Sequence, residues 1–342
     1  SVGVLGSAPI VAKHYEPGLP HDRTTISKGK MSVKVSHEKT FNGNAPNSDT
    51  TPESYGDITK LKTGLKSGVY DHLVKEGFIE EQGPLYKIVR KLNVCYPANP
   101  AKPDEVAPGG RLPVVIIVHG NHSDKVDNHK GHTYLQDALA KEKIISVSIN
   151  MNVGYLFAWT ELRADLIMDT LDALSRMNKS GTRLKNRLDL RNVVLVGHSR
   201  GGEAVCRAAV KNKKTKKYGI KAVCAVSPTD TIGNPKNDSK NKNKSTLTKQ
   251  ATNFFLMLYG ALDGDVSGSG GAKSRVGTGI RLYDRATCNK SMSFIENVNH
   301  NRFNSVWMTD PPFPGIIDRT DDLFMDTDKI PSLLSIPDTQ AM

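Results

Sequence analysis

Short apolar runs alternate with longer amphipathic segments through the middle of the chain. The apolar runs are rich in β-branched residues and predict buried strands at residues 113–118, 144–149, 193–196, 222–226, 254–259 and 292–298, after a first strand at 86–97. The amphipathic segments predict helices at residues 133–141, 160–177 and 203–210, and a further helix that starts near Arg281. Alternating strands and helices form a mostly parallel central sheet with helices on both faces, so we expect an α/β domain.

This pattern is absent from both ends of the chain. Residues 1–65 are rich in Gly, Pro, Ser, Thr, Asn and Lys, and we expect an irregular N-terminal extension there, wrapped on the main domain or used for assembly. The main domain is expected at residues 66–310, and a Pro- and Asp-rich C-terminal tail at residues 311–342. Shorter expectations are strands within residues 7–15 and 31–36, a short helix or strand at 69–76, and a Pro-rich loop at 98–112.

A serine stands at the apex of one strand-to-helix connection. Gly197-His198-Ser199-Arg200-Gly201 follows the strand at 193–196 without a spacer, and a helical segment comes next. This is the context of the G-x-S-x-G nucleophile elbow. The elbow strains the serine backbone, and side chains two residues before or after it would collide, which explains the two glycines. An ordinary Gly-rich turn or a phosphate-binding turn is the alternative.

Further chemically useful residues follow other strands. His119-Gly120-Asn121 comes directly after the strand at 113–118, Asp263 lies in the loop after 254–259, and His300 follows 292–298. Catalytic groups of open parallel sheets collect at the carboxyl ends of the strands. We therefore expect these residues to surround Ser199.

These residues suit an acyl-transfer mechanism. Ser199 is a weak nucleophile by itself, and His300 is the candidate base that takes its proton. Asp263 would hold the imidazole in the required tautomer and stabilise its positive charge. Backbone N–H groups of Arg200 and Asn121 would form the oxyanion hole.

Three aspartates are candidates for the acid. The spacing from Gly260 favours Asp263. Asp265 lies on the same loop, and Asp230 follows the preceding strand. All three stay open at the level of the sequence.

In these motifs the chain resembles the α/β-hydrolase superfamily, which orders its triad as serine, acid and histidine. It is most similar to the cutinase-like, chlorophyllase-like and platelet-activating-factor-acetylhydrolase-like serine esterases, and the similarity includes the helical segment Arg163-Ala164-Asp165-Leu166-Ile167. It covers residues 85–310 and leaves both ends uncovered. The resemblance implies an α/β-hydrolase fold and hydrolysis of carboxylic esters, including lipid-like or polyester-like ones, without a cofactor.

The substrate pocket is expected beside the elbow. Gly120 and His198 would border the substrate, and Tyr155 and Trp159 would supply an apolar wall, although ordinary core packing explains these two rings equally well. The histidines between residues 119 and 132 are irregularly spaced, so we expect no metal site there. A second class of function is a hydrolase-fold protein that binds or assembles, with catalysis lost or secondary.

The charge of the chain limits which classes of partner we expect. The formal net charge is +12, with lysines gathered in residues 211–217 and 236–244. Solvated loops are the simpler interpretation of these lysines, and attraction to an anionic surface is the alternative. Aromatic residues do not interleave with these lysines, so we expect no specific nucleic acid partner.

Four cysteines without a C-x-x-C spacing permit disulfides but do not require them. The printed chain shows no signal peptide, yet we expect a secreted or extracellular protein, and the N-terminal extension could support an oligomer.

Overall fold

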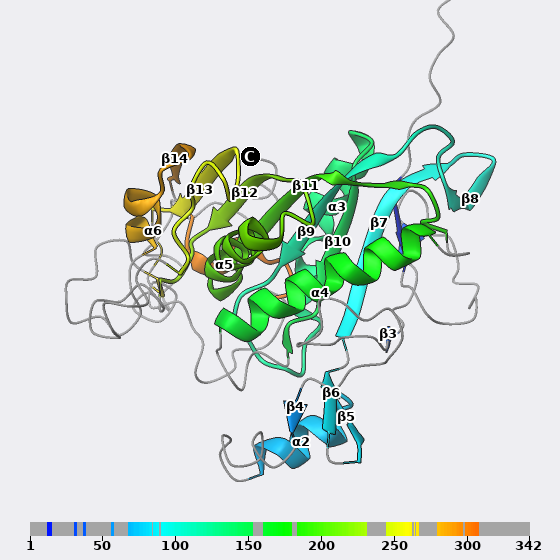
Figure 1. Ribbon diagram of the computed structural model, residues 1–342, viewed down its shortest axis with the longest axis horizontal. Helices are drawn as coiled ribbons and strands as arrows, with labels where there is room; N and C mark the ends of the chain where they lie inside the picture. The colour runs from blue at the N-terminus through cyan, green and yellow to red at the C-terminus, as the bar shows by residue number, and fades with distance from the viewer. Residues whose placement is uncertain are drawn as a thin grey trace, which may run out of the picture.

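A large, mostly parallel sheet forms the centre of the computed structural model (Figure 1). The structure describes residues 12–15, 31–32, 37–38, 56–57, 68–83, 85–88, 90–152, 160–179, 183–230, 244–261, 263, 265–266, 279–296 and 298–307. Within these residues the central strands run in the order β14 (Asn289–Ile295), β13 (Phe254–Gly260), β12 (Ile220–Val226), β11 (Leu188–His198), β9 (Leu112–Val118), β10 (Ile145–Ile149) and β7 (Arg90–Asn99). Neighbours from β14 to β10 are parallel, and β7 is antiparallel to β10.

The middle strands are buried on both faces because helices cover them. Every residue of β10 is buried, as are the last five residues of β9, which explains their nearly continuous apolar sequences. Helices α4 (Thr160–Lys179) and α5 (Arg200–Thr215) lie together on one face, and α3 (Thr133–Lys141) lies on the other (Figure 1). The expected layers and the helix at 133–141 are therefore confirmed.

Helix α5 packs closely on the sheet because its buried side chains are small. Ala204, Ala208 and Ala209 are fully buried, which lets the helix axis approach the strands. Its outer face is tied to α4 by ion pairs from Arg207 and Lys211 to Glu161 at 2.6 and 2.9 Å. This packing fixes the start of α5, where the expected nucleophile stands.

The N-terminal extension contributes strands to the sheet. Strand β1 (Ala12–Tyr15) pairs antiparallel with β7, β2 (Met31–Ser32) pairs parallel with β1, and β3 (His37–Glu38) pairs with β7. The segment at 69–76 is a helix, α2 (Val69–Lys75), beside a small sheet of β4 (Gly56–Asp57), β6 (Leu85–Ile88) and β5 (Ile79–Gln82).

Three expectations about local structure are wrong. The single strand expected at 86–97 is divided between β6 in the small sheet and β7 in the central sheet. The stretch at 98–112 is not only a loop, because β8 (Lys102–Val106) pairs antiparallel with β7 there. In the described residues β8 pairs on one side only, and such an edge strand tolerates Pro103. The last strand ends at Ile295 instead of residue 298 and begins earlier, at Asn289. The first half of this strand is polar and mostly exposed, so a search for apolar runs does not find it. The last described helix, α6 (Ile280–Arg285), agrees with the expected start near Arg281.

The cysteine side chains are thiols that form no disulfide. All four cysteines are free: three are buried, and Cys224 is partly buried. Burial raises the pKa of the Cys224 thiol to about 12. Among the described residues, no helix has the length and apolar content needed to cross a bilayer.

Candidate active site

The backbone of Ser199 is strained at the junction of β11 and α5. Its φ is 57° and its ψ is −122°, a conformation that L-residues rarely adopt. A Cβ on Gly197 would lie 2.2 Å from the carbonyl oxygen of Gly201, and one on Gly201 would lie 2.3 Å from that of Val118. Glycine at both positions is therefore a steric requirement of this turn, as expected for a nucleophile elbow.

A buried carboxylate–imidazole pair lies beyond the neighbouring strands. His300 begins the short helix η4 (His300–Phe303), and its Nδ1 lies 2.8 Å from Oδ2 of Asp263. Both side chains are 2% exposed. Burial favours the neutral acid, but the charge of His300 and hydrogen bonds from His300, Ser227 and the N–H of Val266 outweigh it, so the pKa of Asp263 lies below its ordinary value. An ionised Asp263 accepts the Nδ1 proton, which leaves Nε2 of His300 as the basic nitrogen.

The other two acids occupy different positions. Asp265 has its Oδ2 3.6 Å from Nε2 of His300, and its side chain is 46% exposed. Asp230 is fully buried between Arg281 and Arg285, which approach it at 3.1 and 2.8 Å. Asp230 is therefore engaged in a structural ion pair, and Asp263 is the acid that contacts Nδ1.

The loop after β9 lies against the serine. A Cβ on Gly120 would be 2.7 Å from Cβ of Ser199 and equally close to Cη2 of Trp307, so the backbone approaches the nucleophile as an oxyanion loop requires. His119 is buried and bridges two backbone groups: Nδ1 lies 2.7 Å from the carbonyl oxygen of Gly120, and Nε2 accepts the N–H of Met151 at 2.7 Å. Burial and the charge of Arg163 hold the pKa of His119 well below its usual value.

A tryptophan that the sequence did not single out joins these parts. The ring of Trp307 stacks on His122 at 5.1 Å, lies 4.8 Å from His198 and 6.3 Å from His300. Its Nε1 donates to Oδ1 of Asn128 at 2.7 Å. Trp307 follows the last strand and has no periodic context, so only its rarity, as one of two tryptophans, marked it in the sequence.

The structure brings most of the predicted site residues together. His198 is 1% exposed and packs against the rings of His300, Phe303 and Trp307. Arg200 is the first residue of α5 and follows Ser199 directly. Tyr155 and Trp159 lie outside the described residues, so the apolar wall stays a prediction.

The histidine-rich loop does not form a metal centre in the described part of the chain. No group of three His, Cys, Asp or Glu side chains there has the arrangement to hold a metal ion. Burial instead lowers the pKa of His132 to about 4 and that of His129 to about 3, so both rings are neutral at pH 7.

A comparison with protein families gives a match in the middle of the chain. A family model described as the alpha/beta hydrolase fold matches residues 136–268, which contain Ser199 and Asp263 but neither His300 nor the His119–Asn121 loop. No curated protein matches the chain. The match and the sheet together identify an α/β-hydrolase fold, and the likeness favours hydrolase activity; it does not distinguish the cutinase-like branch from others.

Proposed function

We propose that this protein is a serine esterase that cleaves carboxylic esters through an acyl-enzyme. The observation that carries the proposal is the buried Asp263–His300 pair, with its 2.8 Å contact, whose imidazole packs 4.6 Å from the ring of His198, the neighbour of the strained Ser199. A carboxylate that orients an imidazole, next to a serine held out of ordinary backbone geometry, is the arrangement that activates a hydroxyl as a nucleophile.

In the proposed reaction, Oγ of Ser199 attacks the ester carbonyl carbon while Nε2 of His300 takes the hydroxyl proton. Negative charge develops on the carbonyl oxygen and is stabilised by the N–H groups of Arg200 and Asn121. Collapse of this intermediate expels the alcohol, which receives its proton from His300. Water activated by the same imidazole then releases the acid and restores Ser199.

Hydrolysis of p-nitrophenyl esters of increasing chain length tests this proposal. We expect activity in the parent protein, and its loss in the folded Ser199→Ala and His300→Ala variants. The chain-length preference would also test the lipid-like and polyester-like substrates of the cutinase-like branch. An inactive parent against all esters would favour the second hypothesis, a hydrolase-fold protein that binds or assembles.

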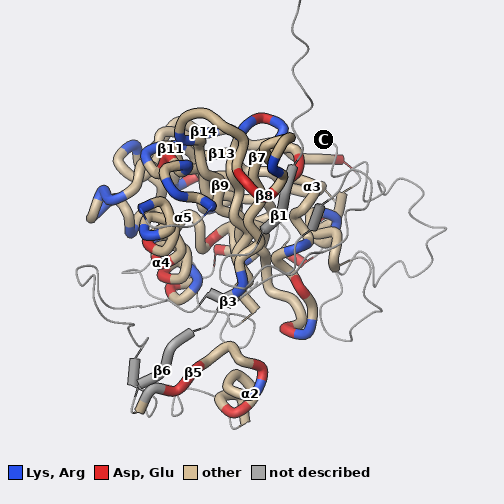
Figure 2. The backbone as a smooth tube through the Cα atoms, turned by 90° about the vertical axis from the view of Figure 1, so that its right-hand side faces the viewer, with Lys and Arg blue, Asp and Glu red and all other residues tan. Residues whose placement is uncertain are grey.

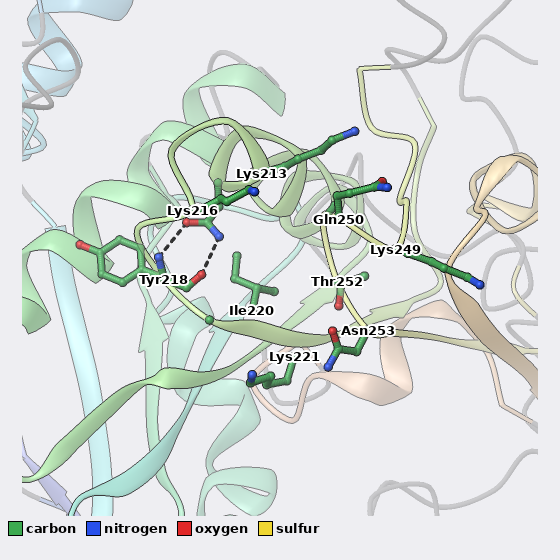
Figure 3. Close-up of a pocket in the computed structure, with 12 residues that line it drawn as sticks. Lys213, Lys216, Tyr218, Ile220, Lys221, Lys249, Gln250, Thr252 and Asn253 are labelled. Atoms are coloured by element: carbon green, nitrogen blue, oxygen red, sulfur yellow. Dashed lines mark hydrogen bonds between the residues drawn. The ribbon is translucent and has the colours of Figure 1, made fainter.

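A basic surface supports a second proposal, contact with an anionic lipid surface. Lysines and arginines gather along α5 and the residues that follow it (Figure 2). A cavity of about 160 Å³ lies there, lined by residues at the amino ends of β12 and β13 (Figure 3). Ser199 follows the carboxyl end of β11, which runs parallel to β12, so the cavity and the serine lie at opposite ends of the strands. Four lysines and no carboxylate line this cavity, and in the described part of the chain these lysines form no ion pair: Lys213, Lys216, Lys221 and Lys249.

Vesicle binding tests this second proposal. We expect binding to phosphatidylserine-containing vesicles that weakens as salt rises, and no binding to neutral phosphatidylcholine vesicles. Changing the four cavity lysines to Gln should abolish it, whereas a control with four other lysines changed should not: Lys75, Lys102, Lys141 and Lys143. Equal loss in both variants would reduce the effect to net charge and contradict a specific surface.

A further inference from the structure

Arg163 is a buried cation whose contacts point to the expected oxyanion loop. It lies in α4, is fully buried, and pairs with no carboxylate among the residues that the structure describes. Buried charges are ordinarily paired with an opposite charge because their desolvation is costly. The partners of this guanidinium are instead three oxygens of residues 119–121.

The geometry of these contacts is specific. Nη1 donates to the carbonyl oxygen of His119 at 3.0 Å, and Nη2 donates to the carbonyl oxygen of Gly120 at 3.5 Å and to Oδ1 of Asn121 at 3.4 Å. The carbonyl oxygen of Gly120 also contacts Nδ1 of His119 at 2.7 Å. Two side chains therefore hold the oxygen of one peptide group.

That peptide group carries the expected oxyanion donor at its other end. The unit that joins Gly120 to Asn121 is planar, and in a trans peptide its N–H points away from its carbonyl. Fixing the Gly120 oxygen on the side of Arg163 fixes the Asn121 N–H on the opposite side. Gly120 itself packs against Ser199, so the orientation of this plane decides where the donor points.

We propose that Arg163 is a positioning residue that holds the Gly120–Asn121 peptide so that the Asn121 N–H faces the developing oxyanion. This inference rests on the proposed esterase function. A charged donor on the carbonyl also polarises the peptide, which strengthens its N–H as a hydrogen-bond donor. Burial and the nearby Arg200 lower the pKa of Arg163 to about 9, so the guanidinium keeps its charge at pH 7.

Steady-state kinetics of Arg163→Met and Arg163→Lys, with a p-nitrophenyl ester, test the inference. Since removal of one oxyanion donor lowers kcat about 10²- to 10³-fold, we expect a loss of that size in Arg163→Met with KM changed less than about threefold. Lysine restores a charge but not the two-nitrogen fork, so Arg163→Lys should recover part of kcat.

A matched control separates positioning from general destabilisation. Leu174→Ala also truncates a fully buried side chain of α4 but lies away from the loop. We expect it to lower the melting temperature without lowering kcat in the folded protein. A trifluoromethyl ketone, which forms a hemiketal oxyanion on the serine, should bind more weakly to Arg163→Met in proportion to the loss of kcat.

The outcomes distinguish this inference from the function on which it rests. A parent without esterase activity would reject the proposed function. An active parent together with an Arg163→Met variant that keeps kcat within threefold would reject only the positioning role. A loss of kcat that Leu174→Ala reproduces would do the same. Should Arg163→Met fail to fold, Arg163→Lys decides: wild-type kcat and ketone affinity in that variant would overturn the inference.

Discussion

Replacing Asp263 by Asn isolates the acid of the proposed triad. The exchange keeps the size of the side chain and removes its charge. Asp263 contacts Nδ1 of His300 at 2.8 Å, and both side chains are buried. In the proposed mechanism the carboxylate therefore stabilises the imidazolium that forms when Ser199 loses its proton. Asn cannot supply this charge, and its amide can donate to Nδ1 and so favour the wrong tautomer.

The expected size of the effect follows from the geometry. Two unit charges about 4 Å apart attract by about 4 kcal/mol at an effective dielectric constant of about 20, which applies to buried protein sites as well. This energy corresponds to about three orders of magnitude in rate. The wrong tautomer of His300 lowers kcat further, to a total loss of about 10⁴-fold. Asp265 faces the imidazole at 3.6 Å but is half exposed, and such pairs contribute about 0–1 kcal/mol, or less than about fivefold.

The assay is a comparison of kcat for one p-nitrophenyl ester among the parent, Asp263→Asn and Asp265→Asn, with circular dichroism melts to verify folding. We expect a loss of about 10³- to 10⁴-fold in Asp263→Asn and less than fivefold in Asp265→Asn. A folded Asp263→Asn variant within tenfold of the parent, or a larger loss in Asp265→Asn, would refute the assignment of the acid.

Three further predictions follow from the same contacts. Gly120→Ala places a methyl group 2.7 Å from Cβ of Ser199, so kcat/KM should fall about 10²-fold; an unchanged value would mean that the loop does not border the serine. Asp230→Ala removes the carboxylate partner of Arg281 and Arg285, so the free energy of unfolding in urea should fall by about 3 kcal/mol while the folded protein keeps its kcat. A loss of kcat in the folded variant would make Asp230 a candidate acid again. The pKa of Asp263 is below its ordinary 3.8, so its pairing stabilises the folded state above about pH 4 and this contribution declines as pH falls through the lower folded-state pKa. The difference in melting temperature between the parent and Asp263→Asn should therefore shrink below pH 4, and a constant difference would contradict the pKa direction.

The sheet could be predicted because its strands are short, apolar and buried on both faces. Apolar runs as short as those at 113–118 and 144–149 are typical of buried strands, and the structure places β9 and β10 there. Strand β8 escaped prediction because an exposed edge strand needs no apolar pattern, and residues 102–106 are mostly charged or exposed.

The sequence alone determines only the part of the site that consecutive residues form. The elbow and its glycines are determined by neighbours in the sequence, so the pattern around Ser199 was sufficient. The spacing from Gly260 favours Asp263 over Asp265 and Asp230, but it cannot establish which carboxylate meets Nδ1 of His300, because that distance joins loops that follow different strands. The same is true of Trp307, whose contacts with His122 and His198 join segments far apart in the chain.

The most direct test of the central claim, that Ser199 is an activated nucleophile, is labelling by a fluorophosphonate probe. Intact mass and peptide mapping of the labelled protein would identify the modified residue. The account predicts one adduct, on Ser199, absent from Ser199→Ala and strongly slowed in His300→Ala. A folded parent protein that takes up no label, or takes it up at another residue, would contradict the account.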